Sequence, residues 1–240
     1  MKNVVLVHGA WHGAWCWERV LPLMAAAGVP TTAVDLPGHG DSTLPLKDLF
    51  GDAEHVSLHL DRLEGGVVLV GHSYGGAVIT QAGTHPAVQH LVYFAAFPLK
   101  DGESAMAAAT ESPDIGHISH EGRPNLAAGF VAGPDDAITL DESVAAECFY
   151  GECDPVTVAG ATARLGPQPA ITLQQAPTEV AWRTTPSTYA VCARDLAVHP
   201  DLQRILARRC GSVVEWPTDH SPFLCRPDLV AGLLVSLAQE

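Results

Sequence analysis

The stretch VGHSYGG, residues 70–76, places Ser73 between glycines at the end of an apolar run. The preceding residues, GVVLV, are typical of a buried strand, and the following residues, AVIT, are typical of the start of a helix. Gly71 and Gly75 stand two positions on either side of Ser73, where larger side chains would collide with the returning backbone. A strand, a sharp turn and a helix are the context of a nucleophile elbow. The stretch therefore predicts a nucleophilic serine at the edge of a sheet.

The composition restricts the class of protein. The chain has 240 residues, of which 47% are hydrophobic and 17% charged, as expected for one globular domain or one domain with a large insertion. The net charge of −14 argues against binding to nucleic acid or to an anionic membrane, because no basic patch is evident to offset repulsion by phosphates. No apolar run reaches the ~18 residues that a membrane span requires.

The cysteines and the start of the chain predict a cytoplasmic protein. Met1-Lys2-Asn3 runs directly into VVLV, which is typical of a first strand, so we expect no signal peptide. The six cysteines have no regular spacing, and the four residues between Cys148 and Cys153 do not match a zinc site. We therefore expect free thiols in a reducing compartment, with no metal and no cofactor.

Six apolar, strand-like runs recur along the chain: NVVLVHG, VPTTAVDLPGHG, GGVVLVGHS, VQHLVYFAAF, STYAVCARD and GSVVEWPTD. Helical patterns follow or separate them at about residues 17–27, 46–63, 75–84 and 227–238. Short apolar strands that alternate with helices predict an α/β fold, with a mainly parallel six-stranded sheet covered by helices on both faces. Ligands of such sheets bind at the carboxyl ends of the strands.

The regular alternation breaks between residues 98 and 186. This stretch is rich in Gly, Pro and Ala, with helical patterns after Asp141 and from Pro155. About ninety residues between two strands are too many for a simple crossover. We predict a core formed by residues 1–97 and 187–240 and an inserted lid, or cap, formed by residues 98–186. The alternative is an enlarged surface loop.

A serine nucleophile needs a base to take its proton and an acid to orient that base. His220 lies in WPTDHSPFL, after the last predicted strand, where a histidine can reach Ser73 from the carboxyl edge of the sheet. His72 is too close to Ser73 along the chain to face its hydroxyl. Other histidines are predicted at helix ends or in loops: His85, His90 and His199. We therefore assign His220 as the base.

Two aspartates are candidates for the acid. Asp195 follows the fifth predicted strand, and Asp101 follows the fourth. Asp219 adjoins His220, and adjacent side chains rarely face each other well enough to orient an imidazole. The loop after the fifth strand should lie beside the loop that carries His220, which favours Asp195 over Asp101.

An oxyanion hole needs two backbone N–H groups that point at the developing negative charge. Tyr74, the residue after the nucleophile, supplies one of them. Ala10, in the stretch HGAWHGAW after the first strand, supplies the other, and Gly9 permits the tight turn. Three separate segments, around Ser73, His220 and Ala10, thus supply the nucleophile, the base and the oxyanion donors of one predicted site.

With these residues identified, the chain resembles the α/β-hydrolase superfamily, and more narrowly the plant methylesterase and hydroxynitrile lyase group with its bacterial esterase relatives. The resemblance covers nearly the whole chain, through these stretches in order: VLVHGAWHGAWCW, DLPGHGDS, GHSYGG, FYGECDP, YAVCARDLAVHPDLQ and DHSPFLCRPDLV. It implies an α/β-hydrolase fold, a triad of Ser73, Asp195 and His220, and oxyanion N–H groups from Ala10 and Tyr74.

Two departures separate this chain from the lyases of that group. The lyases have a hydroxyl residue after the first-strand histidine and a lysine after the catalytic histidine, where this chain has Gly9 and Ser221. Neither residue can perform the lyase role, so the resemblance implies a serine esterase that cleaves a small-molecule carboxylic ester. The alternatives are lyase or cyclase-like acid–base chemistry on the same triad, in which Ser73 is not acylated, and a ligand-binding receptor with little turnover.

Aromatic residues near the predicted site are candidate walls of an apolar pocket: Trp11, Phe97, Phe149 and Trp182. Ordinary packing explains each of them equally well. His12 is a candidate for contacting the substrate or for bracing its own loop. The resemblance also implies that the chain can form a homodimer.

Overall fold

The computed structural model describes residues 1–111, 115–116 and 118–240. A six-stranded sheet runs through these residues in the order β2-β1-β3-β4-β8-β9, and every neighbouring pair is parallel. Its strands are β1 (Asn3–Val7), β2 (Thr31–Val34), β3 (Val67–His72), β4 (Val88–Phe94), β8 (Ser187–Cys192) and β9 (Ser212–Trp216). The predicted parallel α/β sheet is confirmed, and all six of its strands come from the six apolar runs.

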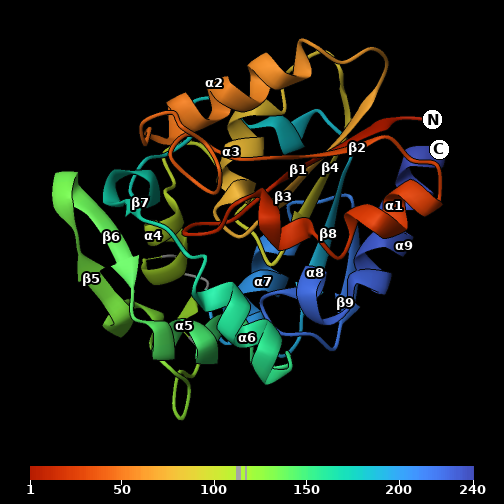
Figure 1. The fold of residues 1–240 in the computed structure, drawn as a ribbon. Coiled ribbons are helices and arrows are strands. Elements are labelled where there is room, and N and C mark those ends of the chain that lie inside the picture. Colours follow the sequence, from red (N-terminus) through yellow and green to blue (C-terminus); the bar gives the residue numbers. More distant parts are fainter. Residues whose placement is uncertain (112–114, 117) are drawn as a thin grey trace.

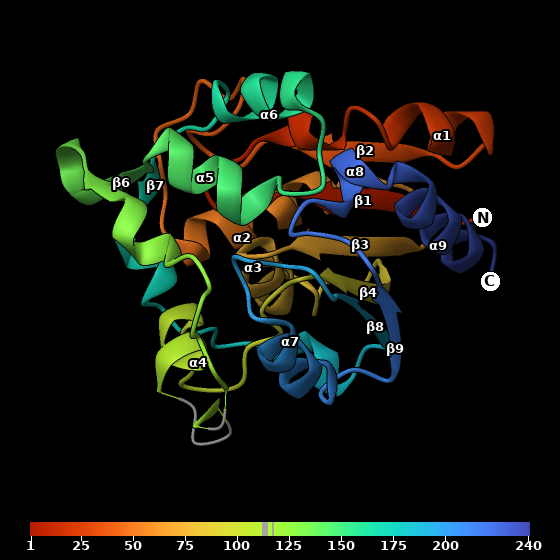
Figure 2. The same ribbon diagram turned by 90° about the horizontal axis from the view of Figure 1, so that it is seen from below.

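Helices cover both faces of this sheet. On one side lie α1 (Leu21–Ala26), α8 (Pro222–Cys225) and α9 (Pro227–Gln239), and on the other lie α2 (Leu49–Leu60) and α3 (Gly75–Ala82) (Figures 1 and 2). A further helix, α7 (Pro200–Ala207), packs against β8. All six residues of β3 are buried, because this central strand has helices above and below it. Burial on both faces explains why the strand before Ser73 is a continuous apolar run rather than an alternating one.

The segment between β4 and β8 forms a separate group of elements, which we call the insertion (residues 98–186). It contains α4 (Ala105–Thr110), α5 (Glu142–Phe149), α6 (Pro155–Thr162) and a small antiparallel sheet of β5 (Phe130–Ala132), β6 (Ala137–Leu140) and β7 (Gln168–Pro169). Figures 1 and 2 show β5, β6, α4 and α5 beside the main sheet rather than within it. The sequence predicted α5 and the start of α6 but none of these three strands.

Helix boundaries differ from the predicted ones where local capping decides them. The stretch predicted as one helix over residues 17–27 begins at the last residue of a 3-10 turn, Ala14–Trp17, and continues through a turn at residues 18–20 before α1. The stretch predicted over residues 46–63 begins only after Asp48, whose side chain accepts a hydrogen bond from the Gly51 N–H at 2.9 Å. The placement of His90 at a helix end or in a loop was wrong. His90 lies in β4, with Nε2 2.9 Å from the Thr188 hydroxyl of β8.

Across residues 1–111, 115–116 and 118–240, no helix is both long and apolar enough to span a membrane.

Candidate active site

Ser73 lies at a sharp turn between β3 and α3. Its φ of 51° is in the left-handed region, which is unusual for a residue with a side chain and is typical of a strained nucleophile elbow. A Cβ on Gly71 would lie 2.5 Å from the Gly75 carbonyl oxygen, and a Cβ on Gly75 would lie 2.6 Å from the His8 carbonyl oxygen. The flanking glycines are therefore required by the close approach of the backbone, as the sequence predicted.

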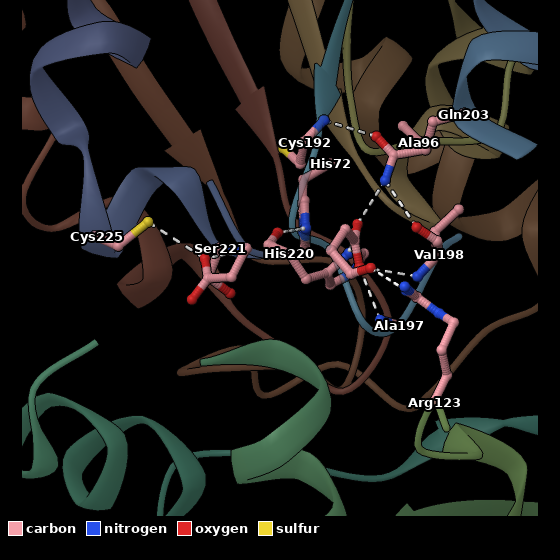
Figure 3. Close-up of polar contacts among 12 residues, drawn as sticks. His72, Ala96, Arg123, Cys192, Ala197, Val198, Gln203, His220, Ser221 and Cys225 are labelled. Atoms are coloured by element: carbon pink, nitrogen blue, oxygen red, sulfur yellow. Dashed lines mark hydrogen bonds and ion pairs between the residues drawn. The ribbon is translucent and has the colours of Figure 1, made fainter. Parts of the chain in front are cut away.

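His220 and Asp195 form a buried hydrogen-bonded pair. His220 Nδ1 lies 2.7 Å from Asp195 Oδ2, and the side chains are 2% and 0% exposed. The other carboxylate oxygen, Oδ1, accepts from the N–H groups of Ala197 at 2.7 Å and Val198 at 2.9 Å. With the Asp195 oxygen as the acceptor of this bond, the imidazole proton lies on Nδ1 and Nε2 is left to accept a proton. Figure 3 shows this network around His220.

The other two aspartates do not contact the His220 side chain. Asp101 is on the surface, 63% exposed, and its carboxylate lies 2.6 Å from Arg183 of the insertion. Asp219 is buried and accepts hydrogen bonds from the N–H groups of Glu152 and Ser221, each at 2.9 Å. Burial raises the pKa of Asp219. Of the two predicted candidates, only Asp195 is brought to the imidazole, and Asp219, which was set aside, does not reach it either.

Ser73 and His220 line the same cavity, which has a volume of about 440 Å³. Three of the predicted wall residues, Trp11, Phe97 and Phe149, also line it. Phe149 stacks on the His220 imidazole with ring centroids 5.3 Å apart. The cavity extends between the core and the insertion, which contributes apolar residues that include Met106, Leu126 and Phe130.

Two predicted pocket residues are not among the cavity-lining residues. Trp182 donates from Nε1 to the Leu99 carbonyl at 2.8 Å and so joins two parts of the insertion. His12 is buried, with Nδ1 2.8 Å from the Ala10 carbonyl and Nε2 2.8 Å from the Tyr150 hydroxyl. Burial lowers the pKa of His12 to about 4, so this imidazole is neutral near pH 7. His12 braces its loop, which was the second of the two roles considered for it.

Ala10 and Tyr74 lie beside Ser73 in the cavity wall. Among the hydrogen bonds of the described residues, neither the Ala10 N–H nor the Tyr74 N–H donates to a protein acceptor. Two unpaired backbone donors next to a nucleophile are the expected arrangement for an oxyanion hole. The next residue, Trp11, is held by its N–H bond to Gln168 Oε1 at 3.2 Å, and the Tyr74 hydroxyl donates to Asp52 at 2.7 Å.

Three residues that the sequence analysis did not identify surround the His220–Asp195 pair. His72 lies 2.9 Å through Nε2 from the His220 carbonyl, and their ring centroids are 4.5 Å apart. Gln203 donates from Nε2 to Asp195 Oδ2 at 2.7 Å and to the Val198 carbonyl at 2.8 Å. Arg123 of the insertion donates to the Asp195 backbone carbonyl (Figure 3). His72 was set aside as the base because it directly precedes Ser73 in the chain, and its bond to the His220 backbone has no sequence signal.

The residues of the site do not form a metal centre. In the described part of the chain, no group of three or more His, Cys, Asp or Glu side chains is arranged to hold a metal ion. All six cysteines have free thiols.

Both the sequence and the structure of this chain are similar to those of known proteins. The sequence model described as "Alpha/beta hydrolase family" matches residues 4–233. Pheophorbidase of Raphanus sativus is 30% identical over 97% of this chain and 92% of that protein. The putative chloroplastic methylesterase 15 of Arabidopsis thaliana is 28% identical over 99% of this chain, which spans 57% of that relative. A pyrethroid hydrolase of Sphingobium faniae JZ-2 has a solved structure similar to this one, with a TM-score of 0.82, 25% identity and coverage of 99% and 97% of the two chains.

Proposed function

Because the chain belongs to the alpha/beta hydrolase family, we propose that it is a serine esterase that cleaves a small-molecule carboxylic ester through Ser73, His220 and Asp195. One observation carries the proposal. A strained serine, a histidine paired with a buried carboxylate and two unpaired backbone N–H groups open on one cavity. The names of relatives that include a methylesterase and a pyrethroid hydrolase support an ester as the substrate.

The proposed mechanism uses each residue in one role. Ser73 Oγ attacks the ester carbonyl while His220 Nε2 accepts its proton, and Asp195 stabilises the imidazolium that forms. The tetrahedral oxyanion accepts hydrogen bonds from the N–H groups of Ala10 and Tyr74. His220 then protonates the leaving alcohol, and it activates the water that hydrolyses the acyl-enzyme. We also propose that the insertion acts as a lid, because it supplies more than half of the residues that line the cavity.

Nothing at the two positions that distinguish the lyases favours lyase chemistry. A Cβ on Gly9 would lie 2.9 Å from the Ser73 Cβ and 2.8 Å from His72 Nδ1, so these two side chains leave no room for a hydroxyl side chain at position 9. Ser221 is fully buried and has no charge. The receptor alternative gains no support either, since binding alone does not need the buried His220–Asp195 pair.

Ser73→Ala tests the proposal. The substitution removes only the Oγ atom, so the fold should be retained while ester hydrolysis falls by a factor of ~10⁶ in kcat. The measurement is the hydrolysis of a 4-nitrophenyl ester of a short fatty acid by the purified proteins, with thermal melting to check the fold. Turnover within tenfold of wild type would end the serine-esterase proposal.

A further inference from the structure

The charged side chains that line the cavity with Ser73 are basic, whereas the whole chain has a net negative charge. The sequence has 27 acidic residues against 13 lysines and arginines, yet the described residues that line the cavity include no Asp or Glu. They do include Arg123, His120 and His199, all at the part of the cavity formed by the insertion and the loop after β8. This cluster, Arg123 with His120 and His199, provides donors and a positive charge beside the catalytic residues.

Arg123 differs from the other arginines of the chain. Seven arginines form ion pairs with a carboxylate: Arg19, Arg164, Arg183, Arg194, Arg204, Arg209 and Arg226. Two others, Arg62 and Arg208, have no such partner but are exposed to solvent. Within the described residues, Arg123 is the one partly buried arginine without a carboxylate partner. A cation that is partly removed from water and left without a counter-charge is costly unless an anion joins it.

The hydrogen bonds of Arg123 leave most of its donors available. Its guanidinium donates to the Asp195 carbonyl, and this is its one protein acceptor among the described residues. A guanidinium has five N–H donors in a fixed fork that matches a carboxylate. Figure 3 shows Arg123 extending from the insertion toward the loop of Ala197 and Val198, which also lines the cavity.

The two histidines add no negative charge beside Arg123, and the His199 imidazole already has a hydrogen-bond partner in the Ser119 backbone. Their ring centroids are 5.5 Å apart, and His199 Nδ1 accepts from the Asp201 N–H at 3.1 Å, so its proton is on Nε2. Burial, together with the charge of Arg123, lowers the pKa of His199. The Asp201 carboxylate lies 3.8 Å from His199 Nδ1 but is already paired with Arg204 at 2.6 Å. The Asp201 carboxylate is therefore the partner of Arg204 and not of Arg123.

We propose that Arg123, in the part of the cavity lined by His120 and His199, binds a carboxylate, so that the preferred substrates are esters that carry a second, anionic group in their acid or alcohol part. The inference deepens the proposed function and rests on it. Half-esters of dicarboxylic acids belong to this substrate class. A neutral ester can still occupy the apolar part of the cavity, but it leaves the guanidinium without a partner.

The test compares matched neutral and anionic esters. One pair is a 4-nitrophenyl half-ester of adipic acid and 4-nitrophenyl hexanoate, and the other is 4-carboxyphenyl hexanoate and phenyl hexanoate. Arg123→Gln should lower kcat/KM about 10- to 100-fold for at least one of the anionic esters, because a hydrogen bond between charged groups is lost, and change the neutral partner much less. Arg183→Gln is the matched control, because it removes the same charge from the insertion outside the cavity.

The outcomes separate this inference from the proposed function. If Arg123→Gln lowers the hydrolysis of neutral and anionic esters equally, Arg123 only joins the insertion to the core and the inference is wrong, while the esterase proposal stands. If the wild type hydrolyses no ester at all, the esterase proposal fails. Calorimetry with adipate then decides the carboxylate site independently: binding at least tenfold weaker in Arg123→Gln than in Arg183→Gln supports it, and equal binding overturns it.

Discussion

At the scale of single residues, the assignment of Asp195 rather than Asp101 as the acid leads to the sharpest prediction. Asp195→Asn keeps the shape of the side chain but removes the charge that stabilises the imidazolium, so kcat should fall by ~10⁴. Asp101→Asn should change kcat by less than threefold, because the Asp101 carboxylate is exposed and pairs with Arg183 at the surface. Both variants should be compared by kcat on one activated ester, with thermal melting as the control. If kcat falls by orders of magnitude in Asp101→Asn and stays near the wild-type value in Asp195→Asn, the assignment of Asp195 is wrong.

Three candidate site residues could be predicted from their positions relative to the strands. Ser73 follows from its glycines and the strand before it, and His220 and Asp195 follow from two loops after strands that become neighbours in the sheet. Gln203 could not be found in this way, although it bonds directly to Asp195. Its contact depends on α7 folding back along β8, and a glutamine in a helix carries no signal for a buried partner.

At the scale of elements, α2 and the elbow before α3 are joined by a buried hydrogen bond whose energy depends on pH. Asp52 of α2 accepts from the Tyr74 hydroxyl at 2.7 Å, and burial raises the pKa of this carboxyl from 3.8 to about 7. A carboxyl whose pKa is raised by folding holds its proton more tightly in the folded state. Its contribution to stability is therefore complete below about pH 4 and decreases as the pH rises toward 7.

Asp52→Asn should remove this dependence, because an amide does not ionise but still accepts from Tyr74. The difference in melting temperature, Asp52→Asn minus wild type, should increase by roughly 5 °C or more between pH 4 and pH 8. Glu54→Gln, at an exposed position of the same helix, is the control and should show no such trend. A difference between Asp52→Asn and wild type that stays constant with pH would contradict the buried, protonated carboxyl.

The elements themselves were predictable to different degrees. The strands of the main sheet are short apolar runs between turn residues, so the sequence shows them directly. The strands β5 and β6 have mixed burial and lie in a stretch rich in Gly, Pro and Asp, so no alternation marks them. The first helical stretch was predicted too long because apolar periodicity continues from Trp17 through the turn at residues 18–20 before α1. Pro22, in the first turn of α1, is the local feature that marks its true start.

At the scale of the whole molecule, general rules for parallel sheets with helical crossovers restrict the possible strand orders to a few, and the observed order is one of them. The position of the insertion does not follow from such rules. It depends on contacts such as Trp11 Nε1 with the Ile138 carbonyl at 2.9 Å and Arg123 with Asp195, which join distant parts of the chain. Phe97 and Phe149 line the cavity and Trp182 does not, and the place of Arg123 in the cavity wall could not be predicted without the position of the insertion.

Covalent labelling tests the central claim most directly, since it asks whether Ser73 is an activated nucleophile. The purified protein should react with a fluorophosphonate to give one phosphonyl adduct per chain, located by peptide mass spectrometry at Ser73, with loss of ester hydrolysis in proportion to labelling. Ser73→Ala should take up no label under the same conditions. An unlabelled wild-type protein, or one labelled at another residue with ester hydrolysis intact, would contradict the account.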